Sequence, residues 1–102
     1  MSINWLNKKK EERILTLHPG GKKGVRILKS RYDMMFLTLL SIFAEYHEIS
    51  YKELSRLSEE RLKGLLDGSI PWLMETVKLD MLARGIIEKT SNNPVKLRIV
   101  II

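Results

Sequence analysis

The sequence predicts an α+β fold that is mainly α, a winged helix-turn-helix with a three-helix core and a C-terminal β-hairpin wing. Apolar residues recur at helical spacing in consecutive segments, and the last of these segments is bounded by a turn and a glycine. Two segments of alternating polarity around a turn then follow. A chain of 102 residues suffices for one such domain. We place the winged-helix domain at residues 30–102 and treat residues 1–29 as a basic N-terminal extension.

The first predicted helix begins at Ser30, because Ser30 and Asp33 have the spacing of a capping box. Apolar residues then occupy nearly every face of the helix as far as Phe43. Such a helix must be covered on more than one side. It is either the central core helix or a core helix that also forms a subunit contact.

The second predicted helix begins at Ser50, which forms a capping-box pattern with Glu53. Leucines continue at helical spacing as far as Leu66. Ser58 is followed by two acidic residues and is a possible second cap, so the segment is either one bent helix or two. The residues just before it, Glu48-Ile49, are a candidate for a strand of a single rung.

The third predicted helix has the clearest boundaries in the chain. Ser69 is its N-cap, Pro71 suits the first turn, and Gly85 suits the left-handed position after the end. At about 100° per residue, one stripe of this helix is apolar and forms its expected core face. That stripe consists of Ile70, Leu73, Met74, Val77 and Met81.

A second stripe on the third helix is also largely apolar, with Trp72, Leu79 and Ala83 as its main members. A helix that reads bases in the major groove presents mainly polar or basic side chains there, so this pattern argues against direct base reading. One interpretation is that the N-terminal segment or a partner chain covers the stripe. The other is an exposed interaction surface for protein.

The residues after Gly85 predict the wing. Ile86–Thr90 and Val95–Ile99 are the strands, and the polar residues that end at Pro94 form the turn. The final residues, 100–102, are all apolar, so we expect them to pair with a strand or to pack at a subunit interface.

The N-terminal extension holds the excess positive charge. Residues 1–31 carry nine Lys or Arg against two Glu, a net +7, whereas residues 32–102 carry nine basic against ten acidic residues, a net −1. The sequence also predicts a short helix that begins at Ser2 and would include Ile14 and Leu17. His18-Pro19-Gly20-Gly21 should form a turn, and residues 22–27 a basic loop or short extended piece. We expect phosphate contacts from basic residues of the extension, the third helix and the wing, namely Lys8, Lys9, Lys10, Lys22, Lys23, Arg26, Lys78, Lys96 and Arg98.

Several classes of function find no support in the sequence. The chain has no cysteine, its two histidines, His18 and His47, do not have the spacing of a metal site, and no catalytic motif is present. No apolar run approaches the roughly 18 residues of a membrane span, and the N-terminus does not have the pattern of a secretory leader. We expect a cytoplasmic protein that is not an enzyme and has neither a metal nor a cofactor.

Three pieces of the chain resemble a group of small uncharacterised bacterial proteins. They are Gly21–Ile27 (K-x-G-V-x-I), Gly68–Trp72 (G-S-I-x-W) and Val77–Gly85 (V-K-L-D-x-x-A-R-G). The resemblance covers most of the chain from about His18 and implies a winged-helix fold without implying an activity. The group has an aromatic pair where this chain has Trp72-Leu73, so the resemblance implies no special role for an aromatic pair here. It also has a lysine-tyrosine where this chain has Arg31-Tyr32.

Two functions from different classes follow as hypotheses. The first, which we favour, is a DNA-binding protein of the transcription-regulator type that acts as a homodimer on double-stranded DNA, with phosphates held by the N-terminal extension and the wing. The second is a protein-interaction or dimerisation module that does not read DNA. In that case the surface around Trp72 would dock a partner or another copy of the chain.

Overall fold

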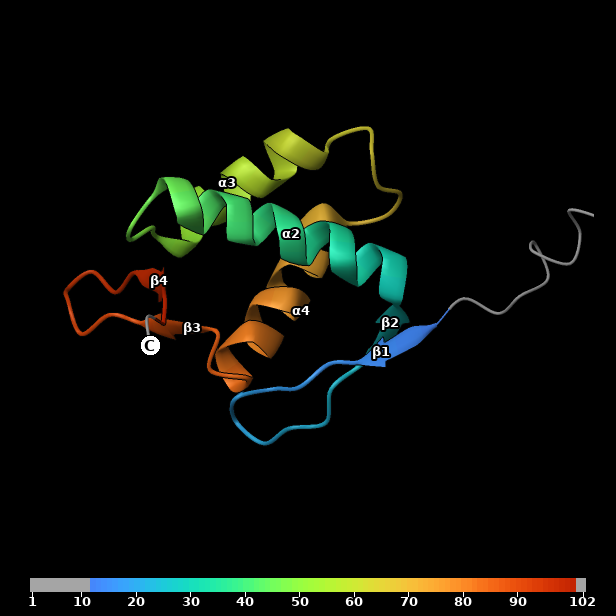
Figure 1. Cartoon of the computed structure of the whole chain (residues 1–102), viewed down its shortest axis with the longest axis horizontal. Coiled ribbons are helices and arrows are strands. Elements are labelled where there is room, and N and C mark those ends of the chain that lie inside the picture. The colour runs from blue at the N-terminus through green and yellow to red at the C-terminus, as the bar shows by residue number, and fades with distance from the viewer. Residues whose placement is uncertain (1–11, 101–102) are drawn as a thin grey trace, which may run out of the picture.

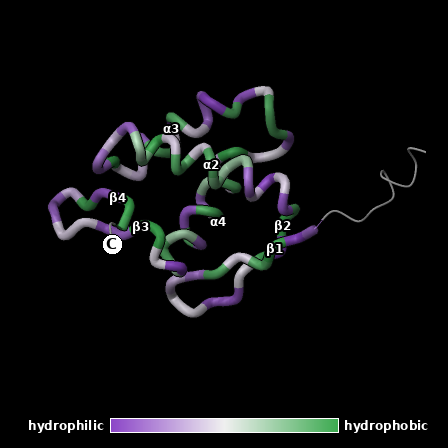
Figure 2. Tube along the Cα trace, viewed as in Figure 1, coloured by the Kyte–Doolittle hydropathy of each residue, from purple (hydrophilic) through white to green (hydrophobic). Residues whose placement is uncertain are grey.

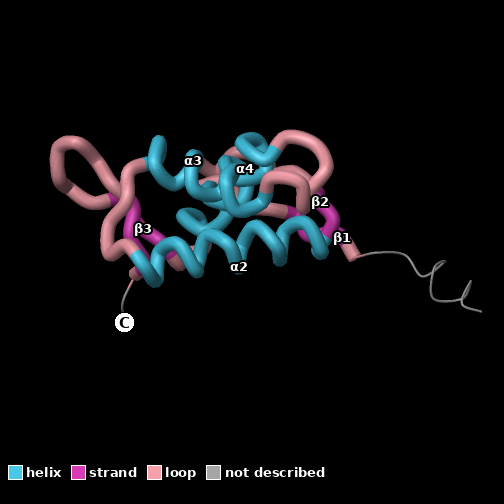
Figure 3. The backbone as a smooth tube through the Cα atoms, turned by 90° about the horizontal axis from the view of Figure 1, so that it is seen from above, coloured by secondary structure: helices cyan, strands magenta, loops and turns pink. Residues whose placement is uncertain are grey.

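The computed structural model describes residues 12–100, and the chain folds into three packed helices flanked by two β-hairpins (Figure 1). The elements, in chain order, are β1 (Arg13–Leu15), β2 (Arg26–Leu28), α2 (Lys29–Glu45), α3 (Tyr51–Leu62), α4 (Ile70–Ala83), β3 (Ile87–Lys89) and β4 (Leu97–Ile99). Viewed from above, the two hairpins lie at opposite ends of α2 (Figure 3). The predicted α+β, winged-helix-like fold is therefore confirmed.

α2 begins earlier than the sequence predicts. Its N-cap is Leu28, which makes no side-chain capping bond, and the Asp33 carboxylate pairs with the Lys29 ammonium at 2.6 Å. The predicted capping box from Ser30 is therefore wrong. The physical reason is that β2 runs directly into the helix, so the strand sets the start of α2.

The core lies between the three helices. Buried residues of α2, such as Met35, Leu39 and Ile42, meet the predicted core stripe of α4, every member of which is buried. α2 is not covered on all sides, because the Leu37 side chain is 64% exposed and Met34 is also exposed. One apolar face of this helix is thus open in the single chain.

α3 is a single helix rather than two. The Ser50 hydroxyl accepts the Glu53 backbone N–H at 3.1 Å, as predicted, but the Glu53 carboxylate pairs with Arg56. Ser58 does not cap a second helix; it is buried within α3, and its hydroxyl donates to the Ser55 carbonyl at 3.0 Å. The helix ends at Leu62.

α4 has the predicted boundaries. The Ser69 hydroxyl accepts the Trp72 backbone N–H at 3.1 Å, and Pro71 lies in the first turn. Gly85 follows the end of the helix with φ +74°, in the left-handed region that favours glycine. The Ile86 N–H then donates to the Met81 carbonyl at 2.9 Å, which completes the helix end.

The C-terminal hairpin is the predicted wing, with shorter strands. β3 and β4 pair antiparallel with Ile87 opposite Ile99, and Ile49 adds the predicted single rung opposite Leu97. The Val100 N–H donates to the Ile86 carbonyl at 3.0 Å, so the chain continues to pair beyond β4. The rest of the apolar end, residues 101–102, lies outside the described residues.

The N-terminal hairpin, residues 13–28, corrects the sequence prediction. Ile14 lies in β1 opposite Ile27 of β2, and Leu17 lies in the loop, so neither belongs to a helix. The residues before position 12, including Ser2, lie outside the described part of the chain. Thr16 extends the pairing by donating its N–H to the Val25 carbonyl at 2.9 Å. A Cβ on Gly24 would stand 1.6 Å from the Thr16 carbonyl oxygen, so this close approach requires glycine.

Candidate nucleic-acid interface

The N-terminal hairpin is fixed to the helical core by the Asp80 cluster, which comprises Leu17, Tyr32, Asp80 and Arg84. The Asp80 carboxylate is fully buried and accepts three hydrogen bonds. The Leu17 backbone N–H donates to Oδ1 at 2.8 Å, the Tyr32 hydroxyl donates to Oδ2, and Arg84 Nε donates to Oδ2 at 2.8 Å. A buried carboxylate is tolerated only when it is paired and hydrogen-bonded in this way.

The cluster also fixes the charge states of the partners of Asp80. Burial, together with the hydrogen bond to Asp80, raises the pKa of Tyr32 above its ordinary value of 10.0. The same carboxylate raises the pKa of Arg84. Tyr32 therefore remains a neutral donor near pH 7, and Arg84 balances the charge of Asp80.

The loop of the N-terminal hairpin lies against the C-terminal half of α4. Two clefts have lining residues from both: Thr16 and Val25 meet Thr76 and Leu79 at one, and Leu82 and Ala83 of α4 contribute to the other. In Figure 2 this loop is mainly white and purple, the colours of residues of intermediate hydropathy and of hydrophilic residues. The hairpin therefore covers part of the surface with which the third helix of a winged helix would approach DNA.

The second stripe of α4 is divided by this arrangement. Leu79 and Ala83, beside the hairpin loop, are only partly exposed, whereas the Trp72 side chain near the start of the helix is 50% exposed. The two interpretations of the stripe thus apply to different parts of it. The N-terminal segment shields the C-terminal part, and Trp72 remains accessible.

The basic residues of the N-terminal hairpin are accessible as well. Lys22, Lys23 and Arg26 are exposed, and within residues 12–100 none of them has a carboxylate partner. Lys8, Lys9 and Lys10 precede the hairpin and lie outside the described residues.

The wing differs from the N-terminal hairpin because its arginine, Arg98, is paired with carboxylates. Arg98 Nε lies 2.8 Å from Glu88 Oε2, and its Nη1 lies 3.3 Å from Glu48 Oε2. These carboxylates raise the pKa of Arg98 and offset its charge. Lys96 is partly exposed, and its backbone N–H donates to the Thr90 hydroxyl at 3.0 Å.

Lys78 does not fit its predicted role as a phosphate contact. Its side chain lies on the core side of α4, and the residue is only 8% exposed. The ammonium lies 2.8 Å from Glu75 Oε1 and 4.2 Å from the centre of the Tyr51 ring. These contacts occupy the cation, so Lys78 is part of the packing between α3 and α4.

A match to a family model covers the N-terminal hairpin, the three helices and β3, and it ends at the first residue of β4. The model describes a family of unknown function, DUF6958, and it matches residues 13–97. The chain belongs to DUF6958. The predicted resemblance to an uncharacterised family is confirmed to that extent, and the DUF6958 match itself assigns no activity. Comparison with the curated proteins and with the solved structures returned no match.

Within residues 12–100, no group of three or more His, Asp or Glu side chains is placed to hold a metal ion. Among those residues no helix is long and apolar enough to cross a membrane.

The sequence missed the Asp80 cluster. In the sequence, Asp80 stands four residues before Arg84, which is the spacing of an ordinary ion pair on a helix surface. The signal that could have located it was its position at the edge of the core stripe, next to Met81. Its other partners, Tyr32 and Leu17, are 48 and 63 residues away, and no local pattern connects them.

Proposed function

We propose that this DUF6958 protein binds double-stranded DNA through its N-terminal hairpin. The observation that carries the proposal is the accessible cationic group formed by Lys22, Lys23 and Arg26, which has no ion-pair partner within residues 12–100. Cations in this state are free to replace the counterions of DNA phosphates. Lys8, Lys9 and Lys10, which come shortly before the hairpin in the sequence, would add to the same contact.

The distribution of charge supports this part of the chain over the wing. The net +7 of residues 1–31 contrasts with the net −1 of the remainder. Arg98 of the wing is already held by two carboxylates, and Lys78 is buried. The N-terminal hairpin is therefore the better candidate for the principal phosphate contact.

Sequence preference should be weak. Phosphate contacts position a protein on DNA, whereas contacts to base edges specify the sequence. The accessible part of the second stripe of α4 offers Trp72 rather than a row of polar donors. We expect a homodimer that acts in the cytoplasm in the manner of transcription regulators, and the exposed Leu37 face of α2 is where a second copy would pack.

The test measures binding to a mixed-sequence DNA duplex by fluorescence anisotropy at several salt concentrations. The variant Lys22→Gln/Lys23→Gln/Arg26→Gln should bind more weakly. It should also lose about 0.9 from the slope of log K against log salt for each phosphate contact removed. The control Lys52→Gln/Lys63→Gln/Lys89→Gln removes the same charge from exposed sites outside the N-terminal hairpin and should change the slope less. Absence of binding to duplex at low salt, or equal effects of the two variants, would exclude the proposal.

The second candidate is a protein-interaction module, favoured by the half-exposed Trp72 at the start of α4. A large aromatic side chain in this state is typical of the centre of an interface. Sedimentation of the protein and of Trp72→Ser would test this function. A defined oligomer that is lost in the variant while helix content is retained supports it, and an unchanged mass without a partner rejects it.

A further inference from the structure

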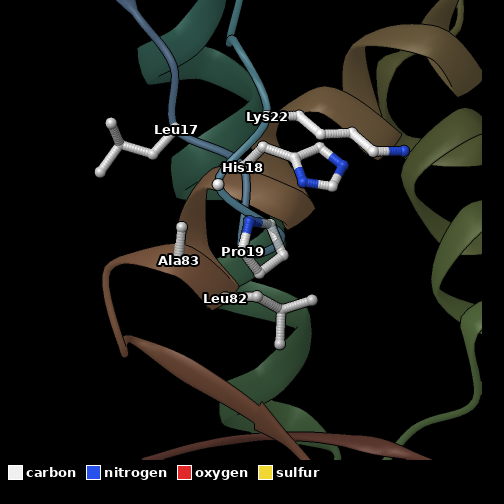
Figure 4. A pocket seen from close by; sticks show the side chains of 7 residues that line it. Leu17, His18, Pro19, Lys22, Leu82 and Ala83 are labelled. Atoms are coloured by element: carbon white, nitrogen blue, oxygen red, sulfur yellow. The ribbon is translucent and has the colours of Figure 1, made fainter.

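A cleft of about 450 Å³ lies between the turn of the N-terminal hairpin and the C-terminal end of α4 (Figure 4). Its lining residues are Leu17, His18, Pro19, Gly21, Lys22, Leu82 and Ala83. Figure 4 shows the His18 ring and the Lys22 side chain extending side by side in the same direction. The polar groups of the cleft are therefore gathered on one side.

The turn of the hairpin determines which nitrogen of His18 is available. The Gly20 backbone N–H donates to His18 Nδ1 at 3.0 Å, so the neutral imidazole carries its proton on Nε2. The Gly21 N–H donates to the His18 carbonyl at 3.0 Å and closes the turn. A Cβ at Gly20 would approach Nδ1 to 3.3 Å, so glycine allows the ring to lie close to the backbone. His18 thus keeps an N–H donor, at Nε2, that the turn does not use.

The chemistry of the cleft suits an anion. His18 Nε2–H and the Lys22 ammonium both donate hydrogen bonds, and no acidic side chain is among the lining residues. Asp80 precedes Leu82 and Ala83 in the sequence but does not line the cleft: it is fully buried, and its carboxylate is hydrogen-bonded within the Asp80 cluster. The carbonyls of residues 80–82 at the end of α4 accept the N–H groups of residues 84–86. These three carbonyls are therefore engaged within the helix end itself.

We propose that this cleft binds a phosphate group, with His18 Nε2–H and Lys22 Nζ donating to its oxygens. A phosphate offers several strong acceptors at once and can accept from both donors. The choice of source rests on the proposed function, which makes it a backbone phosphate of duplex DNA. A soluble phosphate ester has the same chemistry, and the experiment separates the two sources.

The experiment follows the imidazole signals of His18 by NMR while inorganic phosphate is added, with sodium chloride at the same ionic strength as the reference. His47, which follows the C-terminal end of α2 and lines a different cleft, is the internal control. We expect a saturable shift at His18 that is absent at His47. Lys22→Gln should weaken phosphate binding about tenfold, the usual effect of losing one charged hydrogen bond, and Lys63→Gln should leave it unchanged.

A second titration uses duplex DNA. If duplex shifts the same His18 signal, and if His18→Ala and Lys22→Gln weaken both ligands, the DNA backbone is the source. If phosphate binds as described but duplex binding is unaffected by His18→Ala, the cleft serves a soluble phosphate ester. A response of His18 no larger than that of His47, or an equal shift with chloride, overturns the site. DNA binding that persists in that case leaves the proposed function standing, because Lys23 and Arg26 test it independently.

Discussion

The backbone N–H of Leu17 donates to Oδ1 of Asp80 at 2.8 Å across 63 residues of sequence. This bond joins a basic surface hairpin to the buried side of α4. It explains how a hairpin with strands of only three residues keeps a defined position on the helices. A two-stranded hairpin of this size is at most marginally stable by itself.

Replacing Asp80 should therefore destabilise the whole domain. We expect Asp80→Asn to lower the free energy of unfolding by about 2–4 kcal/mol, because the substitution removes the charge that pairs with Arg84 and places an amide against the donors of the cluster. Urea denaturation measures the change. Amide exchange should also become faster at Thr16 and Leu17. Asp67→Asn, at an exposed acid, is the control, and an equal loss in both variants would contradict the central role of Asp80.

The stability of the protein should fall in alkali because of Tyr32. Its pKa is raised in the folded state, so its contribution is fully present below the ordinary value of 10.0 and is lost as pH rises above that value. Tyr32→Phe removes this component. We expect the variant to be less stable by about 1–2 kcal/mol at pH 7 and to show a smaller decline above about pH 10. Urea denaturation at a series of pH values measures both effects, and parallel pH curves for the two proteins would refute the explanation.

Gly24 should not tolerate a side chain. The Cβ of Gly24→Ala would meet the Thr16 carbonyl oxygen at 1.6 Å, so the strands must separate at a cost of about 3 kcal/mol, the upper end of ordinary overpacking. Thermal unfolding reports the stability, and the NMR signals of residues 13–28 report the hairpin. Gly20→Ala is the matched control, since its nearest contacts are side-chain atoms of His18 at 3.3 Å or more. Comparable stability of both variants would show that the hairpin can adjust.

Lys78→Gln should separate packing from phosphate binding. The substitution removes the ion pair with Glu75 and the contact with the Tyr51 ring, which should lower stability by about 1–2 kcal/mol. Duplex affinity at a given salt concentration should remain unchanged below the unfolding transition, because the buried ammonium is not available to DNA. Chemical denaturation and anisotropy measure the two properties. A loss of duplex affinity without a loss of stability would show that Lys78 does contact DNA phosphates.

Local signals predicted the helical part of the fold. Ser50 and Ser69 cap their helices through bonds to a backbone N–H three residues away, and Gly85 ends α4 with a positive φ. Each of these features depends on neighbouring residues, so it is visible in the sequence. The start of α2 was misjudged because Ser30 and Asp33 have the right spacing, whereas the preceding strand determines the boundary.

The candidate site was only partly predictable, because its geometry depends on residues that are far apart in the sequence. The excess of basic residues near Lys22 is a property of composition and could be counted. The position of the hairpin depends on Asp80 and Tyr32, which are distant in sequence, and no period or motif marks their meeting. The burial of Lys78 likewise depends on Tyr51 from another helix.

The bond from Leu17 to Asp80 also sets an order of events during biosynthesis. A ribosome releases the hairpin well before the residue that anchors it, so the strands wait for α4 before they can dock. A nascent chain that stops short of Asp80 already contains Lys22, Lys23 and Arg26 but lacks the carboxylate that positions their hairpin. Docking of the hairpin therefore reports that translation has passed through α4.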